Sequence, residues 1–174
     1  MTDKLCPDDP SRPVRMPIRA AAVCYRRTTG GLEFLLVRTR NGLAWTFPKG
    51  HLEPGESSVQ AAEREAREEA AASGRIAAIP FTRYRYPAWV GPGLPADEVC
   101  IEAYLMEVTS LSRNGSVEKR PTSWFAPDVA VWKLAERRNS AYAREHARVI
   151  AAAVAALQGQ SEPGQSVPTE GSEP

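Results

Sequence analysis

The chain has 174 residues, of which 43% are hydrophobic and 25% are charged, and its formal net charge is +1. This balance predicts one globular domain, and it excludes a global electrostatic field that would attract nucleic acid or an acidic membrane. No apolar run is long enough to cross a bilayer and the N-terminus has no apolar signal region, so we expect a cytoplasmic protein without a membrane partner.

Two terminal segments lack a hydrophobic anchor. Residues 1–16 carry three prolines and several charges, and residues 158–174 consist mostly of Gly, Pro, Ser, Gln and Glu. Segments of this composition bury too little apolar surface to offset the entropy lost on ordering. We therefore expect both ends to be disordered, and we expect the folded domain to cover residues 17–157.

The domain begins with two strand-like runs, over residues 17–27 and 32–40, joined by a glycine-containing turn. A loop rich in glycine and proline follows, and then a segment rich in alanine and glutamate predicts a helix. Ser57 and Gln60 have the spacing of a capping box, which marks the start of this helix, and Gly74 is placed to end it.

Beyond the helix, apolar and β-branched runs predict more strands, and helical periodicity predicts two more helices. The strands are expected over residues 75–81, 82–90, 99–108 and 122–126, and the helices over residues 127–138 and 139–157. Strands that flank a helix in this order indicate the α/β class.

Three glutamates of the first predicted helix share one face. At about 100° per residue, Glu65, Glu68 and Glu69 lie within an arc of roughly 100°. Like charges at i,i+4 spacing cost about 0.2–0.5 kcal/mol in an isolated helix, so the cluster calls for a compensating partner. One interpretation is a solvated face that Arg64 and Arg67 partly neutralise. The other is a divalent cation, because such ions bind carboxylates and the main-chain carbonyls that a glycine-rich loop supplies.

The loop and helix together closely resemble the Nudix box. That pattern is a glycine, five residues, a glutamate, seven residues, Arg-Glu, an aliphatic residue, one residue, Glu-Glu, one residue, a second glycine and an aliphatic residue. The first glycine and every charged position are matched, by Gly50, Glu56, Arg64, Glu65, Glu68 and Glu69. Ala71 stands in place of the second glycine, and the small Ala66 and Ala72 occupy the aliphatic positions.

The resemblance implies an α/β/α sandwich with a mixed sheet, the box loop and helix, and a C-terminal helix. It implies a pyrophosphohydrolase that cleaves diphosphate linkages with Mg²⁺ or Mn²⁺ as cofactor. Carried over by position, three carboxylates would be metal ligands and catalytic residues, with a main-chain carbonyl as a further ligand: Glu65, Glu68, Glu69 and Gly50. The general base stays unassigned.

The resemblance also implies structural roles for other positions of the box. Glu56 and Arg64 would form the ion pair that joins the loop to the helix. A glycine at position 71 would concern helix termination, so Ala71 predicts a helix that runs on towards Gly74.

The loop WTFPKGHLEPGE resembles that of relatives that act on diadenosine polyphosphates and diphosphoinositol polyphosphates. A small-molecule polyphosphate is therefore the expected substrate. The candidate phosphate-binding residues are Lys49, His51, Arg38 and Arg40, because cationic and hydrogen-bonding side chains recognise phosphate oxygens. Tyr84 is a candidate for stacking on a base. The alternatives are solvated loop and strand-end side chains and, for Tyr84, a ring of the core.

Other functions are also compatible with these residues. Removal of pyrophosphate from an RNA 5′ end and hydrolysis of nucleoside triphosphates use the same chemistry. RNA would favour a broader basic surface, so nucleic acid is not expected except as an RNA 5′ end. A non-catalytic nucleotide sensor belongs to a different class and should have lost metal carboxylates that this chain retains. On a later strand, Glu102 could complete a metal site or face solvent.

Overall fold

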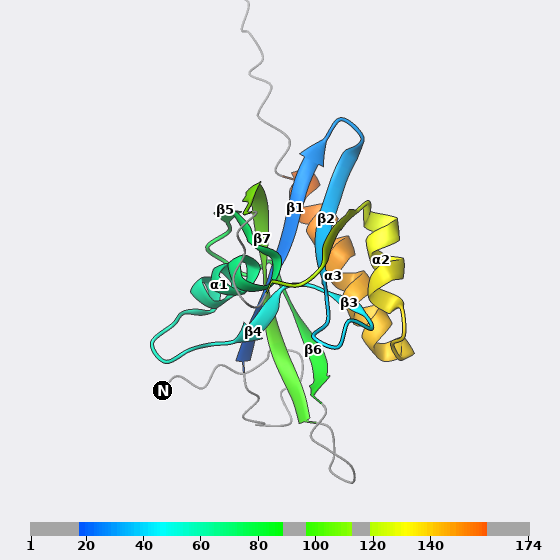
Figure 1. The fold of residues 1–174 in the computed structure, drawn as a ribbon. Coiled ribbons are helices and arrows are strands. Elements are labelled where there is room, and N and C mark those ends of the chain that lie inside the picture. The colour runs from blue at the N-terminus through cyan, green and yellow to red at the C-terminus, as the bar shows by residue number, and fades with distance from the viewer. Residues whose placement is uncertain (1–17, 89–96, 113–118, 160–174) are drawn as a thin grey trace, which may run out of the picture.

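The computed structural model describes residues 18–88, 97–112 and 119–159 (Figure 1). Predictions for residues 1–16 and for most of the C-terminal segment lie outside these residues. Eleven elements follow one another in this part of the chain: β1 (Ile18–Thr28), β2 (Gly31–Arg38), β3 (Trp45–Thr46), β4 (Lys49–His51), α1 (Ser58–Ala70), β5 (Ala72–Ile76), β6 (Thr82–Ala88), β7 (Asp97–Leu111), β8 (Thr122–Phe125), α2 (Pro127–Ala135) and α3 (Ser140–Gly159).

The described strands form one mixed sheet between two helical layers. The strand order is β3-β2-β1-β7-β5, with β4 beside β1, β6 beside β7 and β8 beside β2. Strands β1 and β7 are parallel, and the other described pairs are antiparallel. Helix α1 covers one face, whereas α2 and α3 cover the other (Figure 1). The predicted α/β/α sandwich is confirmed.

Strand β1 lies at the centre because its side chains are apolar on both faces. Ala20, Ala22 and Cys24 belong to the core cluster beneath α1, whereas Ala21 and Val23 belong to the cluster beneath α2 and α3. This alternation is the two-residue period of a strand, and burial on both faces explains the continuous apolar run in the sequence. The small alanines allow α1 to approach the sheet closely, and this approach places the box helix beside β4.

Helix α1 begins as predicted but ends earlier. The capping box of Ser57 and Gln60 is present, with both reciprocal bonds. The prediction that the helix runs on towards Gly74 is wrong, because it ends at Ala70 and Ala71 adopts the left-handed conformation, with φ of 54°. Residues from Ala72 onward pair with β7 instead, so sheet formation overrides local helix propensity.

Gly74 serves a different purpose from the one predicted. It lies in β5 next to an irregularity in the pairing with β7. A Cβ at this position would overlap the main-chain carbonyl of Glu107. Glycine is therefore required here because two backbones approach closely, which is a common reason for glycine inside a strand.

Replacing Ala71 by glycine should stabilise the protein by about 0.5 kcal/mol. The left-handed conformation costs a residue with a Cβ about 1–2 kcal/mol, and glycine would remove this cost. The greater chain entropy of glycine in the unfolded state would offset about 0.4–1 kcal/mol of the gain in stability. Urea unfolding measures the difference. Ala70→Gly is the control, because it introduces the same glycine at a helical position and should destabilise. A loss of stability in Ala71→Gly would contradict the strain argument.

Helix α3 ends slightly later than predicted. Helix α3 extends to Gly159, two residues beyond its predicted end. Among the helices of the described residues, none has the length and apolar character needed to cross a membrane.

Candidate functional site

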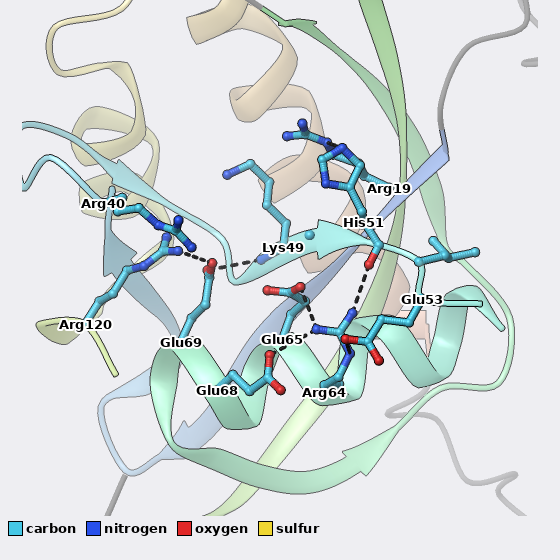
Figure 2. Close-up of a pocket in the computed structure, with 12 residues that line it drawn as sticks. Arg19, Arg40, Lys49, His51, Glu53, Arg64, Glu65, Glu68, Glu69 and Arg120 are labelled. Atoms are coloured by element: carbon cyan, nitrogen blue, oxygen red, sulfur yellow. Dashed lines mark hydrogen bonds and ion pairs between the residues drawn. The ribbon is translucent and has the colours of Figure 1, made fainter. Parts of the chain in front are cut away.

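A cavity of about 820 Å³ opens where β4 meets α1 (Figure 2). Strand β4 pairs with β1 so that Arg19 lies opposite His51 and Ala20 opposite Gly50. This pairing presents the box loop to the acidic face of α1. The cavity gathers glutamates with basic side chains from distant segments: Arg19, Arg40, Lys49, His51, Glu53, Arg64, Glu65, Glu68, Glu69 and Arg120.

Gly50 is packed against the carboxylate of Glu65. A Cβ on Gly50 would overlap the Glu65 carboxyl group, so the absence of a side chain is what allows that group to reach the loop. Glu65 is buried, with 8% of its surface exposed. The first glycine of the box therefore acts through space on the first glutamate of the acidic cluster.

Arg64 joins the loop to the helix and holds two members of the cluster. Its Nε and Nη2 donate to the two carboxylate oxygens of Glu56, at 3.0 and 3.1 Å. The predicted Glu56–Arg64 ion pair is therefore confirmed. Nη1 donates to Glu65 at 2.9 Å and to Glu68 at 3.0 Å, and Nη2 also donates to the carbonyl of His51 at 2.9 Å. The hydrogen bonds from Arg64 lower the pKa of Glu56, so this carboxylate stays ionised.

Glu69 faces different partners from the other two glutamates. Its carboxylate accepts from the main-chain N–H of Lys49 at 3.3 Å and pairs with Arg120 at 2.5 Å. The main-chain N–H of Arg120 also donates to the Glu69 carbonyl at 2.8 Å. Burial raises the pKa of Glu69 to about 7, although the charges of Arg120 and Lys49 act in the opposite direction. This buried carboxylate is therefore held between the loop and the segment before β8.

Lys49 lies at the inner wall of the cavity. Its Nζ donates to the hydroxyl of Thr46 at 2.8 Å. Burial lowers the pKa of Lys49 to about 8, and the nearby positive charges of Arg138, Arg120 and Arg19 lower it further, while Glu69 acts in the opposite direction. Several cations around one ammonium group favour an anionic ligand at this position.

His51 and Arg19 line the cavity beside Lys49, because Lys49 and His51 lie two residues apart on β4 and Arg19 pairs with His51 (Figure 2). The Nε of Arg19 donates to Nε2 of His51 at 3.0 Å, which requires that His51 nitrogen to be unprotonated. Desolvation lowers the pKa of His51, and the charge of Arg19 lowers it further. The imidazole is therefore kept neutral, and the charged group available to a ligand on this side is the guanidinium of Arg19.

Other residues selected from the sequence lie elsewhere. The guanidinium of Arg38 stacks over the ring of Trp45 at 4.2 Å and does not line the cavity. Tyr84 is 1% exposed and belongs to the core, where its ring contacts His146. Glu102 is also buried, accepting from Arg83 at 3.0 Å. The structure thus brings Arg40, Lys49 and His51 to the cavity together with the box, and leaves Arg38, Tyr84 and Glu102 outside its lining.

The lining fits a hard divalent cation in its chemistry. Three carboxylates and the loop of Gly50 border one cavity, and oxygen ligands of this kind suit Mg²⁺ or Mn²⁺. In the described part of the chain, no three His, Cys, Asp or Glu side chains are gathered tightly enough to hold a metal as they stand. The ion pairs with Arg64 and Arg120 explain this, because they direct Glu65 and Glu68 to one partner and Glu69 to another.

Two arginines of the cavity lining, Arg19 and Arg120, were not predicted from the sequence. Arg19 reaches the site because β4 pairs with β1, and Arg120 does so because its segment pairs with the end of α1. Both contacts join residues that are far apart in the chain. No local pattern marks either arginine, although the Arg19 position could be found by expecting the box loop to pair with the first strand.

Comparisons with known proteins agree with this geometry. A family model described as NUDIX domain matches residues 16–152. The asymmetrical bis(5′-nucleosyl)-tetraphosphatase of Sus scrofa is 48% identical over 65 residues, which are 35% of this chain and 44% of that protein. The protein of the same name from Caenorhabditis elegans is 49% identical over 57 residues, 32% of this chain and 41% of that protein. The chain thus spans less than half the length of these curated relatives.

Solved structures extend the likeness to most of the fold. The structure of a C. elegans Ap4A hydrolase has a TM-score of 0.59 and 26% identity, and the match covers 82% of this chain and 98% of that one. A NUDIX hydrolase from Nitrosomonas europaea has a TM-score of 0.58 at 24% identity, over 85% of this chain and 93% of that one, which shows likeness of fold alone.

Proposed function

Because the chain belongs to the NUDIX domain family, we propose that it is a divalent-metal-dependent hydrolase of diphosphate linkages, acting on dinucleoside polyphosphates or diphosphoinositol polyphosphates. The observation that carries this proposal is the cavity in which Gly50, Glu65, Glu68 and Glu69 lie within a rim of arginine and lysine. Carboxylates suit the cation, and the basic rim suits the phosphates.

Each group of residues has a separate part in the proposed reaction. Glu65, Glu68, Glu69 and the Gly50 carbonyl would hold Mg²⁺ or Mn²⁺, which supplies neutralisation of phosphate charge and activation of water when bound. Arg19, Arg40, Lys49 and Arg120 bind phosphate oxygens around the cavity. Arg64 holds Glu65 and Glu68 in position through its two hydrogen bonds.

The proposed substrate class rests on the box loop and on the names of the relatives. The matched relatives are named as bis(5′-nucleosyl)-tetraphosphatases, and the Pro48-Lys49-Gly50 loop resembles that of proteins acting on diadenosine polyphosphates and diphosphoinositol polyphosphates. Burial of Tyr84 removes it as a stacking residue in this arrangement, so our proposal rests on phosphate recognition. The same reasoning fits a dinucleoside polyphosphate and a diphosphoinositol polyphosphate.

The test is incubation of the purified protein with Mg²⁺ or Mn²⁺ and a panel of substrates, followed by chromatography of the products. The panel contains diadenosine polyphosphates, a diphosphoinositol polyphosphate, nucleoside triphosphates and 5′-triphosphorylated RNA. We expect turnover of one of the first two classes that disappears on chelation of the metal. A clear preference for triphosphates or RNA would overturn the substrate assignment. Binding without turnover across the panel would instead support a nucleotide sensor.

The pH dependence of kcat/KM should report the protonation state of Lys49. Only the protonated ammonium attracts phosphate, so its positive charge is fully present well below the pKa of about 8 and is lost as the pH rises through that value. We expect kcat/KM to decline above pH 8. Lys49→Arg keeps the charge at high pH and should remove this decline, whereas Lys49→Met should be slow throughout. An unchanged alkaline decline in Lys49→Arg would show that another group causes it.

A further inference from the structure

A second cavity of about 580 Å³ adjoins the first and is built from the β2–β3 loop and the turn between α2 and α3. Arg40 lines both cavities, so the two meet at this side chain. Arg137 and Arg138 contribute two more guanidinium groups, and Thr39 and Asn41 contribute polar side chains. None of the described residues that line this cavity is acidic.

We propose that this second cavity binds a further phosphate-bearing group of the substrate, beyond the linkage that is cleaved. Guanidinium groups bind phosphate in a bidentate manner, and a concave basic surface without carboxylates selects anions. The proposal rests on the function proposed above and deepens it, because it assigns a place to the part of the substrate that lies outside the catalytic cavity.

Arg138 supplies the most specific observation. Its Nε and Nη2 are buried and have no hydrogen-bond partner in the structure. Arg138 as a whole is half-buried and lines the cavity, so an anion there would supply an acceptor to a guanidinium that has two unmet donors. The guanidinium is also fixed in place, because it stacks on the ring of Tyr142 at 4.3 Å. The Arg138 guanidinium is therefore preorganised for binding an anion.

The backbone on both sides of the second cavity has a defined conformation. Arg137 has φ of 57°, a left-handed conformation that is unfavourable for a residue with a long side chain. The side chain of Asn139 accepts from the N–H of Tyr142 at 2.9 Å, which places the start of α3 directly after the two arginines. On the other side, Thr39 and Ala44 close the β2–β3 loop with a bond of 2.8 Å.

The lining favours charge recognition over base recognition. Its apolar members among the described residues are Leu43 and Ala44, and no aromatic ring lines this cavity in that part of the chain. The expected ligand is therefore a phosphate group. It could belong to the far end of a polyphosphate chain or to an inositol ring, and the experiment below separates these two sources.

Equilibrium binding provides a test that needs no turnover. Calorimetry with inorganic tripolyphosphate, inositol hexakisphosphate and orthophosphate would compare the intact chain with Arg138→Gln and Arg137→Asn. Asn tolerates the left-handed conformation, so the second variant preserves the backbone. We expect each variant to lose about tenfold or more in affinity for at least one of the two larger anions, and less for orthophosphate, which the basic residues of the first cavity can also bind. Arg144→Ala, an exposed arginine of α3 that lines neither cavity, is the control.

The pattern of losses identifies the source of the phosphate. A loss confined to inositol hexakisphosphate supports a ring, and a loss confined to tripolyphosphate supports a chain. Equal affinities in the intact chain and in Arg137→Asn, whose side chain is exposed and whose fold should be preserved, would overturn the proposal even if the protein is an active hydrolase. Conversely, if the protein hydrolyses none of the substrates but the variants show these losses in affinity, the proposed catalytic function is wrong and the proposed binding site stands.

Kinetics give a second readout where a substrate is turned over. For a substrate with phosphates beyond the cleaved linkage, both variants should raise KM about tenfold and leave kcat within about twofold, because a uniform binding interaction is removed. ADP-ribose has no phosphate beyond its one diphosphate, so its KM should not change. An equal rise of KM for long and short substrates would contradict a separate subsite.

Discussion

Glu68→Gln is expected to lower kcat by about 10²- to 10⁴-fold while leaving the melting temperature nearly unchanged. Glu68 is the most accessible of the three clustered glutamates, with 35% of its side chain exposed, and it pairs with Arg64 at 3.0 Å. Glutamine keeps the size and helix propensity and removes the negative charge that a cation requires. Steady-state kinetics measures the loss, and the melting-temperature rise on adding Mn²⁺ should shrink in parallel.

Glu63→Gln is the matched control for this experiment. Glu63 lies on the same helix but outside the cavity, and it makes a loose pair with Arg67 at 3.9 Å. It should retain normal kcat. Glu69→Gln is a less informative variant, because Glu69 is buried and its loss would leave Arg120 without its ion-pair partner. Near-normal turnover in Glu68→Gln with Mg²⁺ would show that the catalytic site lies elsewhere.

Gly50→Ala should nearly abolish activity while the protein still folds. The added methyl group would occupy the position of the Glu65 carboxylate, which is the flexible end of a side chain and can turn away. Glu65 would then lose its place beside the loop and its bond to Arg64. A displacement of about 1 Å in a catalytic group can cost about a hundredfold in rate, so we expect a loss of at least that size. Kinetics and circular dichroism together measure the two effects.

Two other glycines give this experiment its controls. Gly30→Ala introduces a methyl group whose nearest contact is ordinary, at 3.6 Å from Thr28, so neither activity nor stability should change greatly. Gly74→Ala meets rigid main chain at Glu107, so it should destabilise the fold. If Gly50→Ala unfolds the protein as Gly74→Ala does, the role of Gly50 is structural. If it remains fully active, Glu65 is not required at its observed position.

The parts of the candidate site that are formed by residues close together in the chain could be predicted from the sequence. Glu65, Glu68 and Glu69 share one face because helix geometry places i, i+3 and i+4 together, and the capping box of Ser57 and Gln60 marks the start of that helix. The Glu56–Arg64 pair followed from the resemblance to the box and is present. These features depend on residues within about two dozen positions of one another.

The remaining features depend on contacts between distant segments. Pairing with β7 ends the helix at Ala70 and leaves Ala71 strained, a result that helix propensity could not predict. Ion pairing with Arg120 turns Glu69 away from the partner that Glu65 and Glu68 share. Burial among α3 side chains places Tyr84 in the core.

The sequence by itself thus determined the fold class, the acidic helix face and the loop that precedes it, because short-range geometry and residue type are sufficient for them. The tertiary structure decided which basic side chains surround that face: it adds Arg19 and Arg120, includes the predicted Arg40, and leaves Arg38 outside. Arg19, Arg40 and Arg120 come from separate strands and loops, and the pairing of β4 with β1 and the packing of α1 on the sheet bring them to one cavity. Side-chain position across a sheet depends on register, and register is a property of the assembled sheet.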